Sequence, residues 1–68
     1  MFVFGGLVQE YRRKLALTQE GLAHQSGLHP TYISGIESGK RNPTLDVIER
    51  IAAGLKIHIS ELFPRQNE

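Results

Sequence analysis

The chain has 68 residues, which suffices for one domain with a small hydrophobic core, and we expect that domain to span residues 1–68. It contains no cysteine, so disulfides and thiolate metal sites are excluded. The formal net charge at pH 7 is only +1, so the chain as a whole does not attract a polyanion strongly. The apolar stretch 1–8 is too short to span a bilayer and carries no basic leader, so we expect a cytoplasmic protein.

The first helical pattern begins near residue 7. Leu7, Tyr11 and Leu15 stand four residues apart, which predicts an amphipathic helix over residues 7–15 with these three side chains facing inward. The preceding segment, Phe2-Val3-Phe4, has two open roles. It either caps the core or extends across a partner subunit.

A short helix and a tight turn follow. Thr18 is a suitable N-cap for a helix over residues 19–25, although Gly21 leaves the capping box incomplete. Ser26-Gly27 ends this helix, because glycine readily adopts the positive φ that a tight turn needs.

A third helix is predicted over residues 30–37. Pro30 suits its first position, where the missing N–H would have no partner anyway, and His29 is an indifferent cap. Ser38-Gly39 ends it.

Thr44 caps a fourth helix, whose end lies between Gly54 and Lys56. Its apolar stripe consists of Leu45, Ile48, Ile51, Ala52 and Leu55. A fifth short helix is expected near residues 59–63, before a polar tail over residues 64–68. No segment alternates with a period of two, so the predicted fold is all-α, a compact bundle of five short helices.

The helix pair over residues 18–38 has the spacing of a helix-turn-helix, whose second helix can enter the major groove of DNA. Four apolar residues turn inward from the pair, and the small Ala23 is placed at the helix crossing; the four are Leu22, Leu28, Ile33 and Ile36. The outer side of the second helix is polar and uncharged, and it consists of Thr31, Ser34, Gly35 and, unless its ring covers the core, Tyr32. Basic clusters flank the pair at residues 12–14 and 40–41.

The same stretch resembles a known family. The matching residues are Thr18-Gln19, Leu22-Ala23, Gly27, Ile33, Ile36-Glu37, Gly39 and Pro43. They are similar to the phage-repressor-type helix-turn-helix family, also called the Cro/CI or XRE class, and imply a lambda-repressor-like fold. The run Thr31–Glu37, TYISGIE, is similar to the recognition helices of controller proteins of restriction–modification systems.

The resemblance implies a role in binding double-stranded DNA. It assigns base contacts to Thr31 and Ser34, whose hydroxyls donate or accept, within a surface that also includes His29, Pro30, Tyr32 and Gly35. It assigns phosphate contacts to Thr18, Gln19, Lys40, Arg41 and Asn42. Pro30 and Gly35 depart from the family pattern, because neither offers a donor, so DNA shape would supply part of the discrimination.

The resemblance also implies two structural contacts. Arg12 and Glu37 form an architectural ion pair between the first and third helices. A homodimer is expected, with an interface that includes Ile57, Ile59, Leu62 and Phe63. Closure of the monomer core remains the alternative role for these four side chains.

The resemblance implies transcriptional regulation at a palindromic operator, and two other function classes compete with it. An enzyme is disfavoured, because His24, His29 and His58 lack the spacing of metal ligands, and no metal, cofactor or small-molecule ligand is expected. The run Ser38-Gly39-Lys40 lacks the other residues of a phosphate-binding loop. A protein-interaction module, such as the antitoxin of a toxin–antitoxin pair, is the alternative. Salt-dependent binding to duplex DNA separates it from a regulator.

Overall fold

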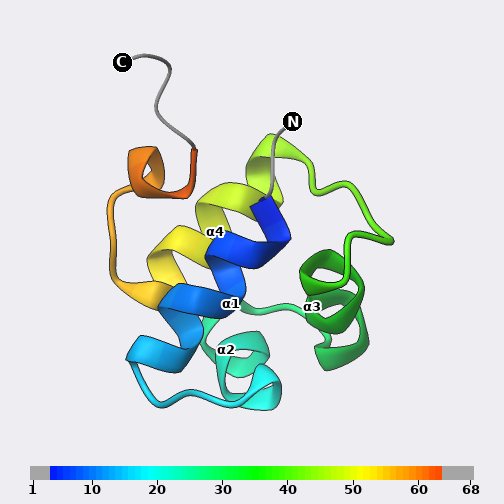
Figure 1. Cartoon of the computed structure of the whole chain (residues 1–68), viewed down its shortest axis with the longest axis horizontal. Helices are drawn as coiled ribbons and strands as arrows, with labels where there is room; N and C mark the ends of the chain where they lie inside the picture. Colours follow the sequence, from blue (N-terminus) through cyan, green and yellow to red (C-terminus); the bar gives the residue numbers. More distant parts are fainter. Residues whose placement is uncertain (1–3, 64–68) are drawn as a thin grey trace.

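A computed structural model of the chain describes residues 4–63 (Figure 1). These residues contain no strand, so the all-α prediction is confirmed. Their elements in chain order are α1 (Phe4–Lys14), α2 (Gln19–Ser26), α3 (Pro30–Glu37), α4 (Leu45–Leu55) and the 3₁₀-helix η1 (Ile59–Leu62). Phe2, Val3 and the tail 64–68 lie outside the described residues, so the roles expected of them stay predictions.

The prediction of five α-helices is wrong in its count, since the last element is a single 3₁₀ turn. Within η1 the N–H of Glu61 donates to the carbonyl of His58 at 3.0 Å, which is the i→i+3 bond of that helix type. Phe63 has φ −110° and ψ 134°, the extended conformation favoured before a proline such as Pro64. The chain therefore leaves the helical region after one turn.

Side-chain caps begin the later helices where the sequence predicts them. The hydroxyl of Thr18 accepts the N–H of Gly21 at 2.9 Å, and that of Thr44 accepts the N–H of Val47 at 3.2 Å. His29 is a better cap than expected, because its Nδ1 accepts the N–H of Thr31 at 3.1 Å. These caps explain why α3 and α4 begin at their predicted residues.

All four α-helices end in the same way, with one residue in the left-handed conformation and a pair of backbone hydrogen bonds back to the last turn. In α1, the N–H of Leu17 donates to the carbonyl of Arg12 and that of Ala16 to Arg13, both at 3.0 Å. The residues with positive φ are Ala16, Gly27, Gly39 and Lys56. Ala16 stops α1 at Lys14, one residue before the predicted end, and α1 begins at Phe4, three residues before the predicted start.

The hydrophobic core draws on every element. It consists of Phe4, Val8, Leu22, Ala23, Ile33, Ile36, Ile48, Ile51, Ala52, Leu55 and Leu62. Leu7 and Tyr11 are only half-buried against this core, and the fully buried residue of α1 is Val8. Leu15 is 47% exposed and Leu45 is 63% exposed, so the prediction that they face inward is wrong.

The helices pack around α2 and α4. α2 lies against both α3 and α4, α1 crosses α3 and α4, and η1 packs on α4 and α1. α2 and α4 approach each other closely at Ser26 and Gly54, where a Cβ on the glycine would lie 3.2 Å from the serine Cβ. The buried Ser26 hydroxyl is satisfied by donating to the carbonyl of Leu22 at 2.8 Å.

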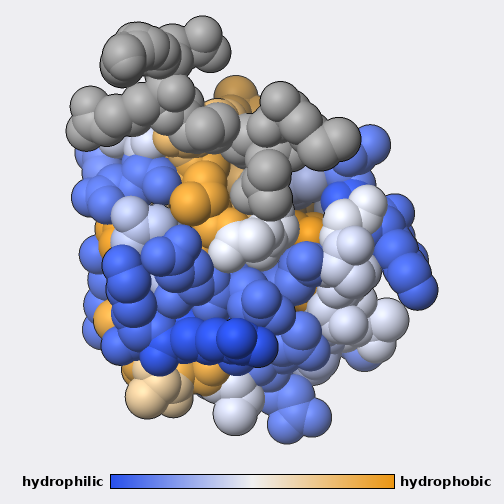
Figure 2. All heavy atoms as spheres, in the orientation of Figure 1, coloured by the Kyte–Doolittle hydropathy of each residue, from blue (hydrophilic) through white to orange (hydrophobic). Residues whose placement is uncertain are grey.

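The surface of this bundle is largely hydrophilic on the face in Figure 2. Hydrophobic residues show most clearly in the upper part of that view, and smaller patches of them appear at its lower and left edges. None of the helices in residues 4–63 has the length and apolar character needed to cross a membrane.

Candidate DNA-binding surface

The outward side of α3 carries two exposed hydroxyl groups, those of Thr31 and Ser34, which we call the hydroxyl face. Neither hydroxyl has a hydrogen-bond partner within residues 4–63. The opposite side of α3 is anchored in the core by Ile33, which is fully buried, and Ile36, which is 1% exposed. The helix thus hides its aliphatic side and leaves an uncharged polar side available to a ligand.

The neighbours of the hydroxyl face have different roles in the fold. His29 is exposed, and Pro30 is half-buried at the first position of α3. Tyr32 is half-buried and packs against the core, so it covers the core and borders the hydroxyl face at once. Gly35 is half-buried and places no side chain of its own on this surface.

Arg12 and Glu37 form a buried ion pair that joins α1 to α3. Nε of Arg12 donates to Oε2 of Glu37 at 2.7 Å and Nη2 donates to Oε1 at 3.1 Å, while the two side chains are 11% and 2% exposed. Nη1 of Arg12 also donates to the carbonyl of Leu17 at 2.7 Å. The guanidinium therefore fixes α3 to α1 and to the loop before α2.

The titration of Glu37 is dominated by these contacts. Burial of its carboxyl favours the neutral form, but the hydrogen bonds from Arg12 and Gln19 and the charge of Arg12 outweigh burial and hold the pKa of Glu37 below its usual value. A hydrogen bond from Gln9 acts in the same direction. The bond to Glu37 in turn raises the pKa of Arg12, against the lowering effect of burial.

Gln19, expected at a phosphate, has a second role that the sequence did not reveal. Its Nε2 donates to Oε1 of Glu37 at 3.0 Å, so the side chain links α2 to the ion pair. Thr18 is exposed, but its hydroxyl is engaged as the cap of α2. Only the fold brings Gln19 to Glu37, because 18 residues separate them and no local pattern predicts the pairing.

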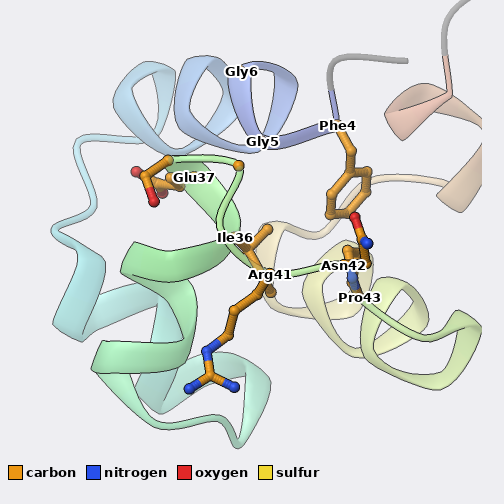
Figure 3. Close-up of a pocket in the computed structure, with 10 residues that line it drawn as sticks. Phe4, Gly5, Gly6, Ile36, Glu37, Arg41, Asn42 and Pro43 are labelled. Atoms are coloured by element: carbon orange, nitrogen blue, oxygen red, sulfur yellow. The ribbon is translucent and has the colours of Figure 1, made fainter. Parts of the chain in front are cut away.

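The loop after α3 carries three exposed polar residues, Lys40, Arg41 and Asn42. Figure 3 shows the Arg41 side chain running back alongside α3. Its guanidinium carbon lies 5.3 Å from the centre of the Tyr32 ring. The same loop lines a pocket of about 420 Å³ together with the start of α1 and the end of α3, and the pocket extends from Phe4 to Pro43. The loop thus brings the Arg41 cation to the Tyr32 ring, at the border of the hydroxyl face.

Metal and phosphate-loop chemistry receive no support from this arrangement. Among the described residues, no group of three or more His, Asp or Glu side chains is placed to hold a metal ion. His29 and His58 cap α3 and η1, and His24 is exposed. Ser38 donates to the carbonyl of Gly35, as expected of a residue that closes a helix.

The residues expected at a dimer interface divide into two groups. Leu62 is fully buried in the core of the chain, so that side chain closes the monomer core and is not available to a partner. Ile57 and Ile59 are half-buried against the core, and Phe63 is 40% exposed. Any contact with a second copy through this region would therefore centre on Phe63.

The sequence of residues 8–62 matches a family model described as helix-turn-helix. The chain belongs to this helix-turn-helix family. This family is the XRE class that the sequence was predicted to resemble, so the prediction of the family is confirmed. The chain is accordingly a DNA-binding regulator of transcription and not an enzyme.

Relatives within the family are similar over most of their length. Control protein C.MunI of a Mycoplasma species is 49% identical over 61 residues, which cover 88% of this chain and 82% of that protein. Control protein C.BamHI of Bacillus amyloliquefaciens is 44% identical over 62 residues, which cover 90% of this chain and 76% of that protein. The crystal structure of the restriction-modification controller protein C.AhdI from Aeromonas hydrophila superposes with a TM-score of 0.87 at 43% identity, over 88% and 91% of the two chains.

Proposed function

We propose that this regulator works as a homodimer on a palindromic operator in double-stranded DNA and controls the genes of a restriction–modification system. The control proteins that it resembles, and the controller protein whose fold it shares, support the last part. The observation that carries the DNA-binding part is the hydroxyl face of α3, which is exposed and free of partners while Ile33 and Ile36 hold the helix in place.

In this proposal the surface divides between bases and phosphates. Thr31 and Ser34 contact base edges with their hydroxyls, and the Thr31 methyl can meet a thymine methyl. His29, Pro30, Tyr32 and Gly35 form the rest of the surface that faces the groove. Phosphates are held by Lys40, Arg41, Asn42 and, with the first N–H groups of α2, by Thr18 and Gln19.

Binding to a duplex obtained by selection from a randomised library with the full chain is expected to depend steeply on salt. Each neutralised phosphate adds about 0.9 to the magnitude of the log–log slope. The double variant Thr31→Ala/Ser34→Ala should narrow the affinity gap between selected and unrelated duplexes by about 1–3 kcal/mol, with the salt slope unchanged. Gel shifts at several salt concentrations measure both quantities.

Ser60→Ala is the matched control, since it removes an exposed hydroxyl from η1. It should leave the affinity gap unchanged. Duplex binding that is weak, independent of salt and indifferent to sequence would contradict the proposal. Such a result would favour the protein-interaction module instead.

A homodimer is proposed because one α3 covers only a few base pairs. Two copies on half-sites about 34–36 Å apart multiply the discrimination of one helix. We place the contact between the two copies at Phe63, which is 40% exposed, together with Ile57 and Ile59, which are half-buried against the core.

Phe63→Glu is expected to convert the dimer to monomers and to weaken operator binding at the same time, because it puts a charge into an apolar interface. Analytical ultracentrifugation at micromolar concentration measures the mass. Leu15→Glu places the same charge on another exposed apolar residue and should leave the mass unchanged. A monomeric wild-type chain at that concentration would contradict the dimer.

A further inference from the structure

The Arg41 side chain occupies space that a side chain at position 35 would otherwise fill. A Cβ built on Gly35 would lie 3.0 Å from Cγ of Arg41, 3.1 Å from Cδ and 3.3 Å from Nε. The stem of Arg41 therefore lies directly across α3 at its bare position. Figure 3 shows the side chain running along α3 and away from Phe4 and Asn42.

Two further contacts hold this arrangement in place. The N–H groups of Lys40 and Arg41 donate to the carbonyl of Gly35 at 2.9 and 3.2 Å, which fixes the loop backbone to the helix. At the far end of the side chain, the guanidinium lies over the face of the Tyr32 ring at 5.3 Å, a favourable cation–π distance. Contacts with α3 thus fix the Arg41 backbone, its aliphatic segment and its guanidinium.

The placement supplies a charge that α3 lacks. Between positions 30 and 36 the helix has no charged side chain, and the carboxylate of Glu37 is engaged by Arg12. Arg41 brings a cation from the following loop to the border of the hydroxyl face. A guanidinium already held in place loses less conformational freedom on binding, so it contributes more affinity than a free surface arginine.

We propose that Gly35 and Tyr32 are positioning residues that hold the Arg41 guanidinium beside the hydroxyl face, so that the loop and α3 meet DNA as one preorganised surface. This inference rests on the proposed DNA-binding function. In it, the absence of a side chain at Gly35 serves to seat Arg41 and not to let the α3 backbone approach the DNA.

Gly35→Ala tests the inference in a double-mutant cycle with Arg41→Ala. The added methyl fits a helix but would lie closer to the Arg41 stem than ordinary van der Waals contact, so the stem must shift by a few tenths of an ångström and take its guanidinium with it. Gly35→Ala should therefore weaken binding to the library-selected duplex about tenfold without lowering the melting temperature. In the Arg41→Ala background the same substitution should change the dissociation constant less than twofold. Gel shifts at fixed salt measure all four proteins.

Substitutions at Tyr32 provide a second test of the inference. Tyr32→Phe retains the ring under the guanidinium, so Arg41→Ala should weaken binding by the same factor in the Tyr32→Phe background as in wild type. In the Tyr32→Leu background the effect of Arg41→Ala should be much smaller. In the free protein, nuclear magnetic resonance should show the Arg41 side-chain protons shifted by the Tyr32 ring. That shift should disappear in Gly35→Ala.

The outcomes separate this inference from the function on which it rests. A wild-type chain that does not bind duplex DNA refutes the proposed function. If wild type binds, an equal loss from Gly35→Ala with and without Arg41 overturns the inference, because the glycine then serves close approach to DNA. Unchanged binding by Gly35→Ala, or no ring shift at Arg41 in the free protein, overturns it too.

Discussion

Replacing Glu37 with alanine lowers the free energy of unfolding by about 3–5 kcal/mol in our expectation, which would leave little of the stability of so small a domain. The substitution leaves the Arg12 guanidinium buried with the carbonyl of Leu17 as its remaining partner, and it removes the acceptor of the Gln19 amide. Urea unfolding followed by circular dichroism, at several protein concentrations, measures the loss.

Glu10→Ala is the matched control, because it removes one carboxylate from an exposed ion pair, with Lys14 at 3.9 Å. It should cost less than about 1 kcal/mol, as surface pairs do. Equal losses from the two variants would show that the pair between Arg12 and Glu37 does not organise the fold.

The pH dependence of stability distinguishes the charge of Glu37 from its shape. Because the folded pKa of Glu37 lies below its unfolded value, its contribution is complete above the unfolded pKa and is lost as the pH falls through the folded pKa. Glu37→Gln keeps the shape and cannot titrate. The stability difference between wild type and Glu37→Gln should therefore shrink as the pH falls below about 4.5, the ordinary pKa of a glutamate. A difference that stays constant over this range would rule out the charged pair as its source.

Gly5→Ala has the second large effect, a destabilisation of about 3 kcal/mol, because it forces α1 away from α3. The added Cβ would overlap the carbonyl oxygen of Ile36 and lie 2.9 Å from that of Glu37. Figure 3 shows Gly5 directly beside the end of α3. The obstacle is backbone, so no side-chain rotation relieves it, and the helices must separate. Thermal or urea unfolding measures the change.

Gly6→Ala is the control for this position. Gly6 is the next residue of the same helix and is exposed, so alanine there should stabilise α1 by up to about 1 kcal/mol through its helix propensity. A loss of stability at both positions would mean that α1 tolerates no side chain at its start for a reason other than contact with α3.

Local signals in the sequence predicted α3 and α4 well. Thr44 and Pro30 mark the first turns of these helices, and Gly39 marks the end of α3, each through a preference that acts within a few residues. α1 was predicted less well, since it begins three residues earlier than predicted and buries Phe4 and Val8 instead of Leu7 and Tyr11. Its stop depends on Ala16 in the left-handed conformation. Alanine has no preference for the left-handed conformation, so the sequence does not predict it there. The packing of the folded chain compensates for its small cost in backbone conformational energy.

The candidate site likewise combines features that local sequence signals predict with features that depend on tertiary packing. The exposed hydroxyl face follows from the 3.6-residue period of α3, since Ile33 and Ile36 fix which side is buried. Family resemblance indicated the pairing of Arg12 with Glu37. No pattern within the chain indicated that Gln19 would join that pair or that Arg41 would fold back onto Gly35.

The sequence by itself thus determined the helices with strong caps, the polar side of α3 and membership of the family. Helix caps and amphipathic periodicity depend on residues that lie within a few positions of one another in the sequence. Their contributions to the free energy of folding can therefore be recognised from the sequence alone. The tertiary structure decided which side of α1 is buried, that Leu45 and Leu15 are exposed, and where Arg41 lies. Those outcomes depend on packing between residues far apart in the chain, whose energies appear only once the helices are assembled.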